Sequence, residues 1–367
     1  MKKILENHLD KYPLMEAIDI LKLLYQSEFG GGHMIANENQ SLIRIKNEYE
    51  EMKNYIPSAA VVCEPIGDNI CRIYLNALTE GLLPETLNKI FVNSANEKHG
   101  SVEGLEEKIS ILIDFLKQSP LSTIFSVNNK SSLSDTIEKW KSTGYPIISH
   151  SQTYRDNYYP AYRVVDINYA KYYSVFLEID RFLSSDSFGN NNPNKPLLIS
   201  IDGMCGSGKT TLSKLLESIY DCNVFHMDDF FLQPYQRTEE RLNEVGGNVD
   251  YERFYDEVLS HINEKNGLSY RIYDCQTGQL GKTITVPYKQ INIIEGVYSN
   301  HPYFKDAYDI RFFLEIPETL QKERIIKRNG KEFANRFFTE WIPKENAYFN
   351  AFSVKDKCIL IAFENKI

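Results

Sequence analysis

The chain has 367 residues, of which 42% are hydrophobic and 25% are charged. This balance is typical of globular proteins and excludes disordered, collagen-like and disulfide-scaffold classes. The net charge is −9 and both halves are acidic, which argues against a nucleic-acid partner. No apolar run is long enough to span a bilayer, and the six cysteines form no CxxC pair or zinc-ligand cluster. We therefore predict a cytoplasmic protein of about two domains that binds neither nucleic acid nor membrane, with homo-oligomerisation left open.

One polar segment divides the sequence. Residues 184–196 are rich in Ser, Asn, Gly and Pro, which favour exposed linkers and offer little to bury. We predict an N-terminal domain over 1–183, a linker over 184–196 and a C-terminal domain over 197–367.

The first half reads as mainly α-helical. Apolar residues recur at spacings of three and four, the pattern of an amphipathic helix, over residues 14–25, 42–52, 84–91 and 105–116. A further helix is expected over 168–182. Residues 61–75 fit a hairpin across Gly67-Asp68-Asn69 as well as a helix. No motif in this half indicates its role.

Two stretches of the first half admit two interpretations each. The glycines of residues 27–33 could let the backbone approach a ligand, or could simply end a helix. The aromatic and arginine-bearing residues 150–163 could grip a planar or anionic ligand, or could pack as core.

The second half alternates in the α/β manner. Helical segments such as 212–219 separate short apolar runs that predict strands, namely 197–201, 223–227, 291–294, 310–316 and 358–362. Continuous apolar strands separated by helices predict a parallel sheet with helices on both faces. Residues 269–286 look like a hairpin projecting from that sheet.

The strongest chemical signal follows the first of these strands. Residues 203–210 read Gly-Met-Cys-Gly-Ser-Gly-Lys-Thr, the G-x-x-x-x-G-K-[ST] pattern of a phosphate-binding loop, and an amphipathic helix follows. Backbone N–H groups of such a loop surround phosphate oxygens, and the helix dipole favours the negative charge. The predicted nucleotide-binding residues are Gly203, Gly206, Ser207, Gly208, Lys209, Thr210 and Thr211.

Two acidic residues end neighbouring strands. Glu295 closes the run 291–294, and Asp228 follows the run 223–227. Ligands of open α/β sheets bind beyond the carboxyl ends of the strands, so both carboxylates are expected near the phosphate loop. We predict that Thr210, Glu295 and Asp228 organise Mg²⁺, and that Asp228 accepts the proton of an attacking hydroxyl.

These residues resemble the uridine kinase and phosphoribulokinase group of P-loop kinases. The resemblance runs from Leu197 onward, and the phosphate loop carries it together with Asp228, Asn248-Val249-Asp250, Tyr273-Asp274 and Glu295-Gly296. It implies a nucleoside-kinase-like α/β fold, ATP and Mg²⁺ as cofactors, and transfer of phosphate to a small-molecule acceptor, in the first place a nucleoside.

The resemblance also implies individual roles. The residue matching Asp228 is the general base for the sugar hydroxyl, the one matching Asp250 contacts the sugar, and the one matching Tyr273 lines the base pocket. A lid contributes arginines that neutralise the transferred phosphoryl group, and three arginines fall in the corresponding stretch. We assign Arg324 and Arg328 to catalysis and Arg336 to substrate binding.

The chain departs from uridine kinases in the expected base pocket. It has Asp229 and Phe231 where uridine kinases read Ser and Tyr, and residues 276–278 where they place a histidine. Pantothenate, a sugar or a sugar phosphate therefore stay open as acceptors. So do a P-loop ATPase switch that signals through the N-terminal half, and a catalytic role for that half itself.

Overall fold

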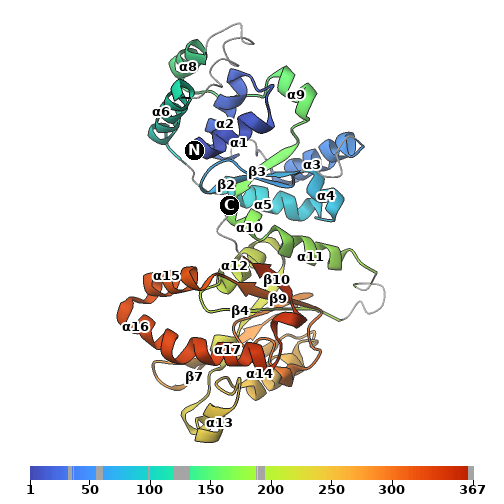
Figure 1. Cartoon of the computed structure of the whole chain (residues 1–367). Coiled ribbons are helices and arrows are strands. Elements are labelled where there is room, and N and C mark those ends of the chain that lie inside the picture. The colour runs from blue at the N-terminus through green and yellow to red at the C-terminus, as the bar shows by residue number, and fades with distance from the viewer. Residues whose placement is uncertain are drawn as a thin grey trace. The chain divides into compact units, whose positions relative to one another are not determined.

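The computed structural model describes residues 1–31, 35, 37–54, 61–97, 100–118, 133–186, 188 and 195–362. The chain forms two compact units, Met1–Tyr173 and Ser174–Ile367 (Figure 1). Much of the predicted linker 184–196 lies outside the described residues, so the domain boundary stays a prediction. In the part of the chain that the structure describes, no helix is both long and apolar enough to cross a membrane.

The first unit is mostly helical. Its helices are α1 (Lys2–Lys11), α2 (Ala17–Phe29), α3 (Glu38–Met52), α4 (Asn76–Glu80), α5 (Pro84–Asn96), α6 (Val102–Gln118), α8 (Leu133–Ser142), α9 (Gln152–Tyr158) and α10 (Ile167–Lys171). A small antiparallel sheet accompanies them, in the order β1 (Cys63–Pro65), β2 (Ile70–Tyr74) and β3 (Tyr162–Asp166).

Several expectations for this unit can be compared directly with the structure. Residues 61–75 contain the hairpin β1–β2 and not a helix. The helix expected over 168–182 is divided at Tyr172 into α10 and α11 (Tyr173–Leu183). Gly30 ends α2 with φ of 66°, which supports the helix-ending interpretation for that glycine, whereas residues 32–34 lie outside the described part. Strand β3 was not expected, because its sequence was interpreted only as an aromatic stretch.

A buried chain of polar contacts runs through the first unit. Asp19 accepts from His150 over 2.9 Å, the other ring nitrogen of His150 lies 2.7 Å from the Tyr162 hydroxyl, and Tyr162 donates to Gln26. Gln26 also accepts from Arg72, whose guanidinium lies 4.4 Å from the centre of the Tyr162 ring. His150 and Tyr162 belong to residues 150–163, so these side chains pack as core.

The second unit contains the predicted parallel sheet. Its order is β10 (Ile359–Ala362), β9 (Ile310–Glu315), β4 (Leu197–Gly203), β8 (Ile291–Glu295) and β5 (Cys222–His226), and all neighbours pair in parallel. The central strand β4 is buried along its whole length. The predicted hairpin is also present, as the antiparallel pair β6 (Leu268–Asp274) and β7 (Gln279–Val286).

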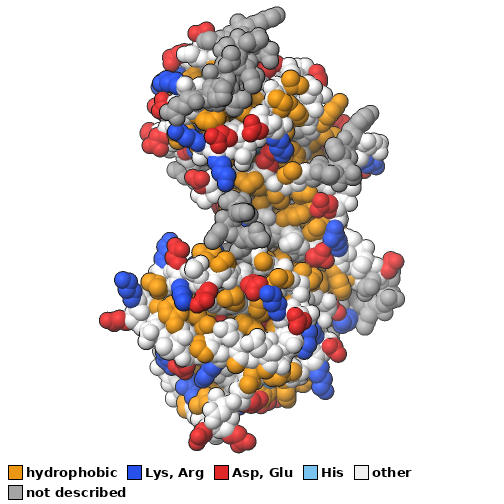
Figure 2. Space-filling view, in the orientation of Figure 1, with side chains coloured by type: hydrophobic (Ala, Val, Ile, Leu, Met, Phe, Trp, Pro, Cys, Tyr) orange, Lys and Arg blue, Asp and Glu red, His pale blue; other side chains and the backbone are white. Residues whose placement is uncertain are grey.

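Helices lie on both sides of this sheet. In Figure 1, α11 and α12 (Lys209–Ile219) lie on one side, and α14 (Tyr251–Glu257) and α17 (Ile342–Ala351) lie on the other. The remaining α-helices of this unit are α13 (Glu239–Asn243), α15 (Glu318–Asn329) and α16 (Lys331–Arg336). The predicted α/β architecture of the C-terminal part is thus confirmed. Figure 2 shows acidic and basic side chains interspersed over the visible face of each unit.

Candidate nucleotide and acceptor site

The phosphate-binding loop connects β4 to α12. Gly203 has φ of 134°, and a Cβ atom there would collide with the backbone of Leu314 on β9, so this position requires glycine. Gly206 and Gly208 also have positive φ, of 74° and 107°, and Gly208 forms the N-cap of α12. A glycine turn of this kind at a helix N-terminus can present backbone N–H groups to phosphate oxygens.

The lysine of the loop lies against the loop itself. Lys209 is 9% exposed, and its Nζ donates to the carbonyl oxygens of Gly203 at 2.8 Å and of Met204 at 3.1 Å. The buried hydroxyl of Ser207 has no hydrogen-bond partner among the described residues, and Thr211 is exposed in the first turn of α12. These contacts hold the ammonium group of Lys209 against the first two residues of the loop.

Strand register brings Glu295 to the loop. Glu295 ends β8 between β4 and β5, where it pairs with Ile201 on one side and His226 on the other. Its Oε1 accepts from the Thr210 hydroxyl at 3.1 Å and lies 2.6 Å from Nδ1 of His226. The hydrogen bond to Glu295 raises the pKa of His226. Sequence patterns had not singled out His226, although it immediately precedes the acidic turn.

Asp228 follows β5 directly, in the short 3-10 helix η2 (Met227–Phe230). Its side chain reaches solvent, yet surrounding protein raises the pKa of this carboxyl, and the negative charge of Glu295 adds to the effect. The positive charges of Lys209, His226 and Arg328 act in the opposite direction. A carboxylate whose pKa is raised toward neutrality is better suited to accept a proton than an ordinary aspartate.

The three arginines expected in a lid differ in the groups that they contact. Arg324 on α15 donates to the loop carbonyls of Gly206 at 3.0 Å and Ser207 at 3.3 Å, and Arg328 lies 3.8 Å from the sulfur of Cys205. Arg336 on α16 instead pairs with Glu340 at 2.9 Å. Two of the three arginines thus contact the phosphate loop, whereas the third is engaged elsewhere.

The proposed acceptor residues lie close to η2. The backbone N–H of Asp250 donates to the carbonyl of Phe230 at 2.7 Å, at the end of the turn that carries Asp228. The Asp250 carboxylate is buried, caps α14 through the N–H of Arg253, and accepts from Gln236 at 3.0 Å. Tyr273 on β6 is also buried. Asp250 therefore has a structural role in addition to the one that the sequence suggests.

A buried carboxylate that sequence analysis did not find also contacts the phosphate loop. Glu345 on α17 is 7% exposed and accepts from the backbone N–H of Cys205 at 3.0 Å. Burial raises the pKa of Glu345 to about 7. One turn later, Tyr348 donates to Asp202 at 2.9 Å. No local motif could reveal these contacts, because the partners lie about 140 residues apart in the sequence.

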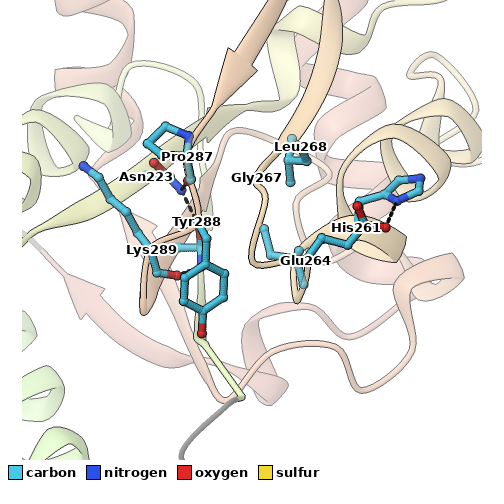
Figure 3. Close-up of a pocket in the computed structure, with 10 residues that line it drawn as sticks. Asn223, His261, Glu264, Gly267, Leu268, Pro287, Tyr288 and Lys289 are labelled. Atoms are coloured by element: carbon cyan, nitrogen blue, oxygen red, sulfur yellow. Dashed lines mark hydrogen bonds and ion pairs between the residues drawn. The ribbon is translucent and has the colours of Figure 1, made fainter.

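A shallow crevice elsewhere in the second unit is unrelated to this chemistry. Figure 3 shows Asn223, Pro287 and Lys289 on one side of it and His261 and Glu264 on the other. It lies where β5 and β8 begin, at the opposite edge of the sheet from the phosphate loop. No predicted site residue lines it.

The oxygen ligands beside the loop fit a magnesium ion. The Thr210 hydroxyl and the Glu295 carboxylate lie together, and Asp228 carries a further carboxylate nearby. In the described part of the chain, no group of three or more His, Cys, Asp or Glu side chains forms a metal cage. Mg²⁺ usually binds through one or two carboxylates together with substrate phosphates, so the residues present suit it without such a cage.

Comparison with known proteins gives distant relatives that each match part of the chain. The uridine kinase of Ureaplasma parvum is 28% identical over 174 residues, which cover 44% of this chain and 84% of the relative. The uridine kinase of Ligilactobacillus salivarius is 28% identical over 150 residues, covering 39% of this chain and 70% of the relative. The pantothenate kinase of Streptococcus mutans is 26% identical over 258 residues, covering 65% of this chain and 74% of the relative.

One similar solved structure is that of a possible uridine kinase from Bacillus stearothermophilus. The match covers 46% of this chain and 89% of the other chain, with 22% sequence identity and a TM-score of 0.35. No protein-family model matches the chain. The phosphate loop, the strand order around it and the sequence relatives lead to the same conclusion. The C-terminal part of this chain is a distant homologue of uridine kinases and of a pantothenate kinase, and it is similar to the P-loop small-molecule kinases of the uridine kinase and phosphoribulokinase group.

Proposed function

We propose that the second unit is an ATP- and Mg²⁺-dependent kinase that phosphorylates a hydroxyl group of a small molecule. The observation that carries the proposal is the convergence of Lys209, Glu295 and Asp228 at the carboxyl ends of adjacent strands. Phosphoryl transfer needs mainly positioning and charge stabilisation, and these groups supply both.

Different residues of the chain have different roles in the proposed reaction. Lys209 and the loop N–H groups hold the nucleotide phosphates, while Arg324 and Arg328 neutralise the charge of the transferred group. Thr210 and Glu295 would hold Mg²⁺, which when bound shields the phosphate charge. Asp228 orients the acceptor hydroxyl and takes up its proton.

Two acceptor classes have specific support. A nucleoside is supported by the uridine kinases among the relatives and by the positions of Asp250 and Tyr273 beside η2. Pantothenate is supported by a different observation. The alignment with the pantothenate kinase of S. mutans covers 65% of this chain, against 44% for the uridine kinase of U. parvum.

The test is release of ADP from Mg·ATP with a panel of nucleosides, pantothenate, sugars and sugar phosphates. We expect a signal that depends on the acceptor. Lys209→Ala and Asp228→Asn should each lower kcat on the order of 10² to 10⁴-fold. Lys214→Ala is the matched control, because Lys214 lies exposed on the same helix.

Full activity in both site variants would contradict the assigned site. A panel without any acceptor-dependent signal, combined with slow ATP hydrolysis that responds to a macromolecule, would instead favour an ATPase switch.

A further inference from the structure

The phosphate loop is also held by two side chains that have no role in the proposed phosphoryl transfer. We infer that Glu345 and Gln321 are positioning residues, which fix the two peptide groups on either side of Cys205 and thereby shape the loop for phosphate. This inference rests on the nucleotide binding of the proposed function and adds two residues to it.

The loop needs such support because its own backbone is permissive. Gly203, Gly206 and Gly208 all have positive φ, and glycine has access to many other conformations. A peptide group in such a loop can turn over unless hydrogen bonds hold it. The contacts of the residues between these glycines therefore decide which way the N–H and carbonyl groups point.

Glu345 fixes the peptide group between Met204 and Cys205. Its Oε2 accepts from the N–H of Cys205 at 3.0 Å. In a trans peptide the N–H and the carbonyl point to opposite sides, so this bond turns the Met204 carbonyl away from α17. That carbonyl accepts from Nζ of Lys209 at 3.1 Å and from the N–H of Ser207 at 3.1 Å. Glu345 thus acts through one peptide group on the position of the Lys209 ammonium.

Gln321 on α15 fixes the next peptide group in the opposite sense. Its Nε2 donates to the carbonyl of Cys205 at 3.0 Å, so the N–H of Gly206 points away from α15. Arg324, one turn further along α15, donates to the carbonyls of Gly206 and Ser207. Three successive carbonyls thus face α15, and the N–H groups of the same peptides point to the opposite side of the loop, which is the side available to a phosphate.

Both positioning side chains are buried and held in place. Gln321 is 2% exposed and Glu345 is 7% exposed. Tyr348, on the same face of α17 as Glu345, donates to Asp202 at 2.9 Å and so anchors this helix to β4. The side chain of Cys205 packs against the apolar cluster between α15 and α16. The two hydrogen bonds therefore connect the loop to a packed support, as precise positioning requires.

Loss of either bond should weaken nucleotide binding. Without Glu345 the N–H of Cys205 loses its acceptor, and the peptide can turn so that the Met204 carbonyl no longer meets Lys209. Binding of Mg·ATP would then have to supply the free energy that restores the loop geometry, which lowers the affinity. Because a hydrogen bond to a charged group contributes more than one between neutral groups, the effect of Glu345 should exceed that of Gln321.

The test is equilibrium binding of Mg·ATP, measured by isothermal titration calorimetry. Glu345→Ala should raise Kd about 10- to 100-fold, and Gln321→Met, which keeps a side chain of similar size but lacks the N–H donor, about 3- to 10-fold. Glu345→Gln keeps an acceptor for the N–H of Cys205 and should bind as tightly as the parent protein. Glu323→Ala is the matched control, because Glu323 lies exposed on α15.

Binding stoichiometry separates positioning from a loss of folded protein. Unfolded protein that does not refold lowers the number of nucleotides bound per chain, whereas a misplaced loop raises Kd at full stoichiometry. If Glu345→Ala does not fold, Gln321→Met tests the adjacent peptide group in its place. An unchanged Kd in the variants that fold, or equal weakening by Glu345→Gln and Glu345→Ala, would overturn the inference.

Failure of the kinase function has a different signature. If no compound gives acceptor-dependent ADP release but Glu345→Ala weakens Mg·ATP binding, the kinase function is refuted and the positioning role stands. Acceptor-dependent ADP release together with unchanged binding in the variants would mean the reverse. An absence of Mg·ATP binding to the parent protein would refute both.

Discussion

Gly203 ends the central strand β4 in a backbone conformation that residues with a side chain rarely adopt. The backbone of Leu314 on the neighbouring strand occupies the space that a Cβ atom would need. Both conditions arise from the close pairing of β4 with β9. The first glycine of the phosphate loop is thus required by the sheet as much as by a nucleotide.

Gly203→Ala should therefore destabilise the second unit even without nucleotide. The Cβ atom would clash with backbone atoms of Leu314, which cannot move aside cheaply, so we expect a loss of a few kcal/mol or more in the free energy of unfolding. Chemical denaturation of the apoprotein measures it. Gly330→Ala is a useful comparison, because Gly330 also has positive φ but nothing within 4 Å of the added Cβ. Equal stability of the two variants would contradict the steric explanation.

Glu345 makes stability depend on pH in a predictable direction. Its pKa is about 7 in the folded protein against a usual 4.5, so the folded state holds more protons than the unfolded state between these values. Stability is therefore lost as pH rises through this interval.

Glu345→Gln removes this loss while keeping an acceptor for the N–H of Cys205. Relative to the parent protein, the variant should gain on the order of 2 to 3 kcal/mol in free energy of unfolding between pH 5 and pH 8. Urea titrations at both pH values measure it. Glu332→Gln, at an exposed position on α16, should show no such change. A pH-independent effect of Glu345→Gln would rule out the charge as its cause.

The helices and strands that the sequence predicted best are those with a clear local pattern of apolar residues. Strand β4, helix α12 and the β6–β7 hairpin followed from apolar runs and periodicity, and the P-loop motif placed the nucleotide site between the first two. Strand β3 was missed, because its pairing partner β2 is about 90 residues away and its aromatic residues have no clear period. The contacts of Glu345 and Tyr348 were missed for the same reason, since tertiary packing and not local spacing creates them.

His150, in the segment before α9, makes a buried contact with Asp19 on α2, and protonation of this histidine at low pH is expected to weaken the first unit. Burial, together with the positive charges of Arg72 and Lys22, lowers the pKa of His150 to about 4, although its bond to Asp19 opposes this shift. The unfolded chain thus binds more protons than the folded one between about pH 6.5 and pH 4, and stability falls as pH decreases through that range.

We expect this acid-dependent loss in the first unit to be reduced in His150→Gln, which does not titrate. Unfolding followed by the fluorescence of Trp140, which lies in the core of this unit, at pH 7 and pH 4.5 measures the difference. His261→Gln is the control, because His261 is exposed in the second unit. An identical pH dependence in His150→Gln and the parent protein would contradict the assignment.

At the scale of the whole molecule, each unit has its own hydrophobic core. The core of the first unit includes Leu5, Ile20 and Leu112, and that of the second includes Phe225, Phe254 and Phe313. Two cores predict two unfolding transitions, and only the second unit carries the proposed nucleotide site.

Saturating Mg·ATP should therefore raise the melting temperature of one calorimetric transition and leave the other unchanged. A ligand at about 100 times its Kd adds roughly 2.7 kcal/mol to the unit that binds it. The Lys209→Ala variant should show both transitions without the shift. If both transitions of the parent protein shifted together, the units would not unfold independently.

The contact between Glu345 and Cys205 also has a consequence for the order of events during synthesis. The ribosome makes the phosphate loop just after the midpoint of the sequence, but the helix that supplies Glu345 and Tyr348 appears about 140 residues later. At a translation rate of roughly 5 to 20 residues per second, these partners are synthesised about 7 to 28 seconds after the loop. Nascent chains arrested before α17 should therefore bind nucleotide poorly, and this activity should be acquired late in translation.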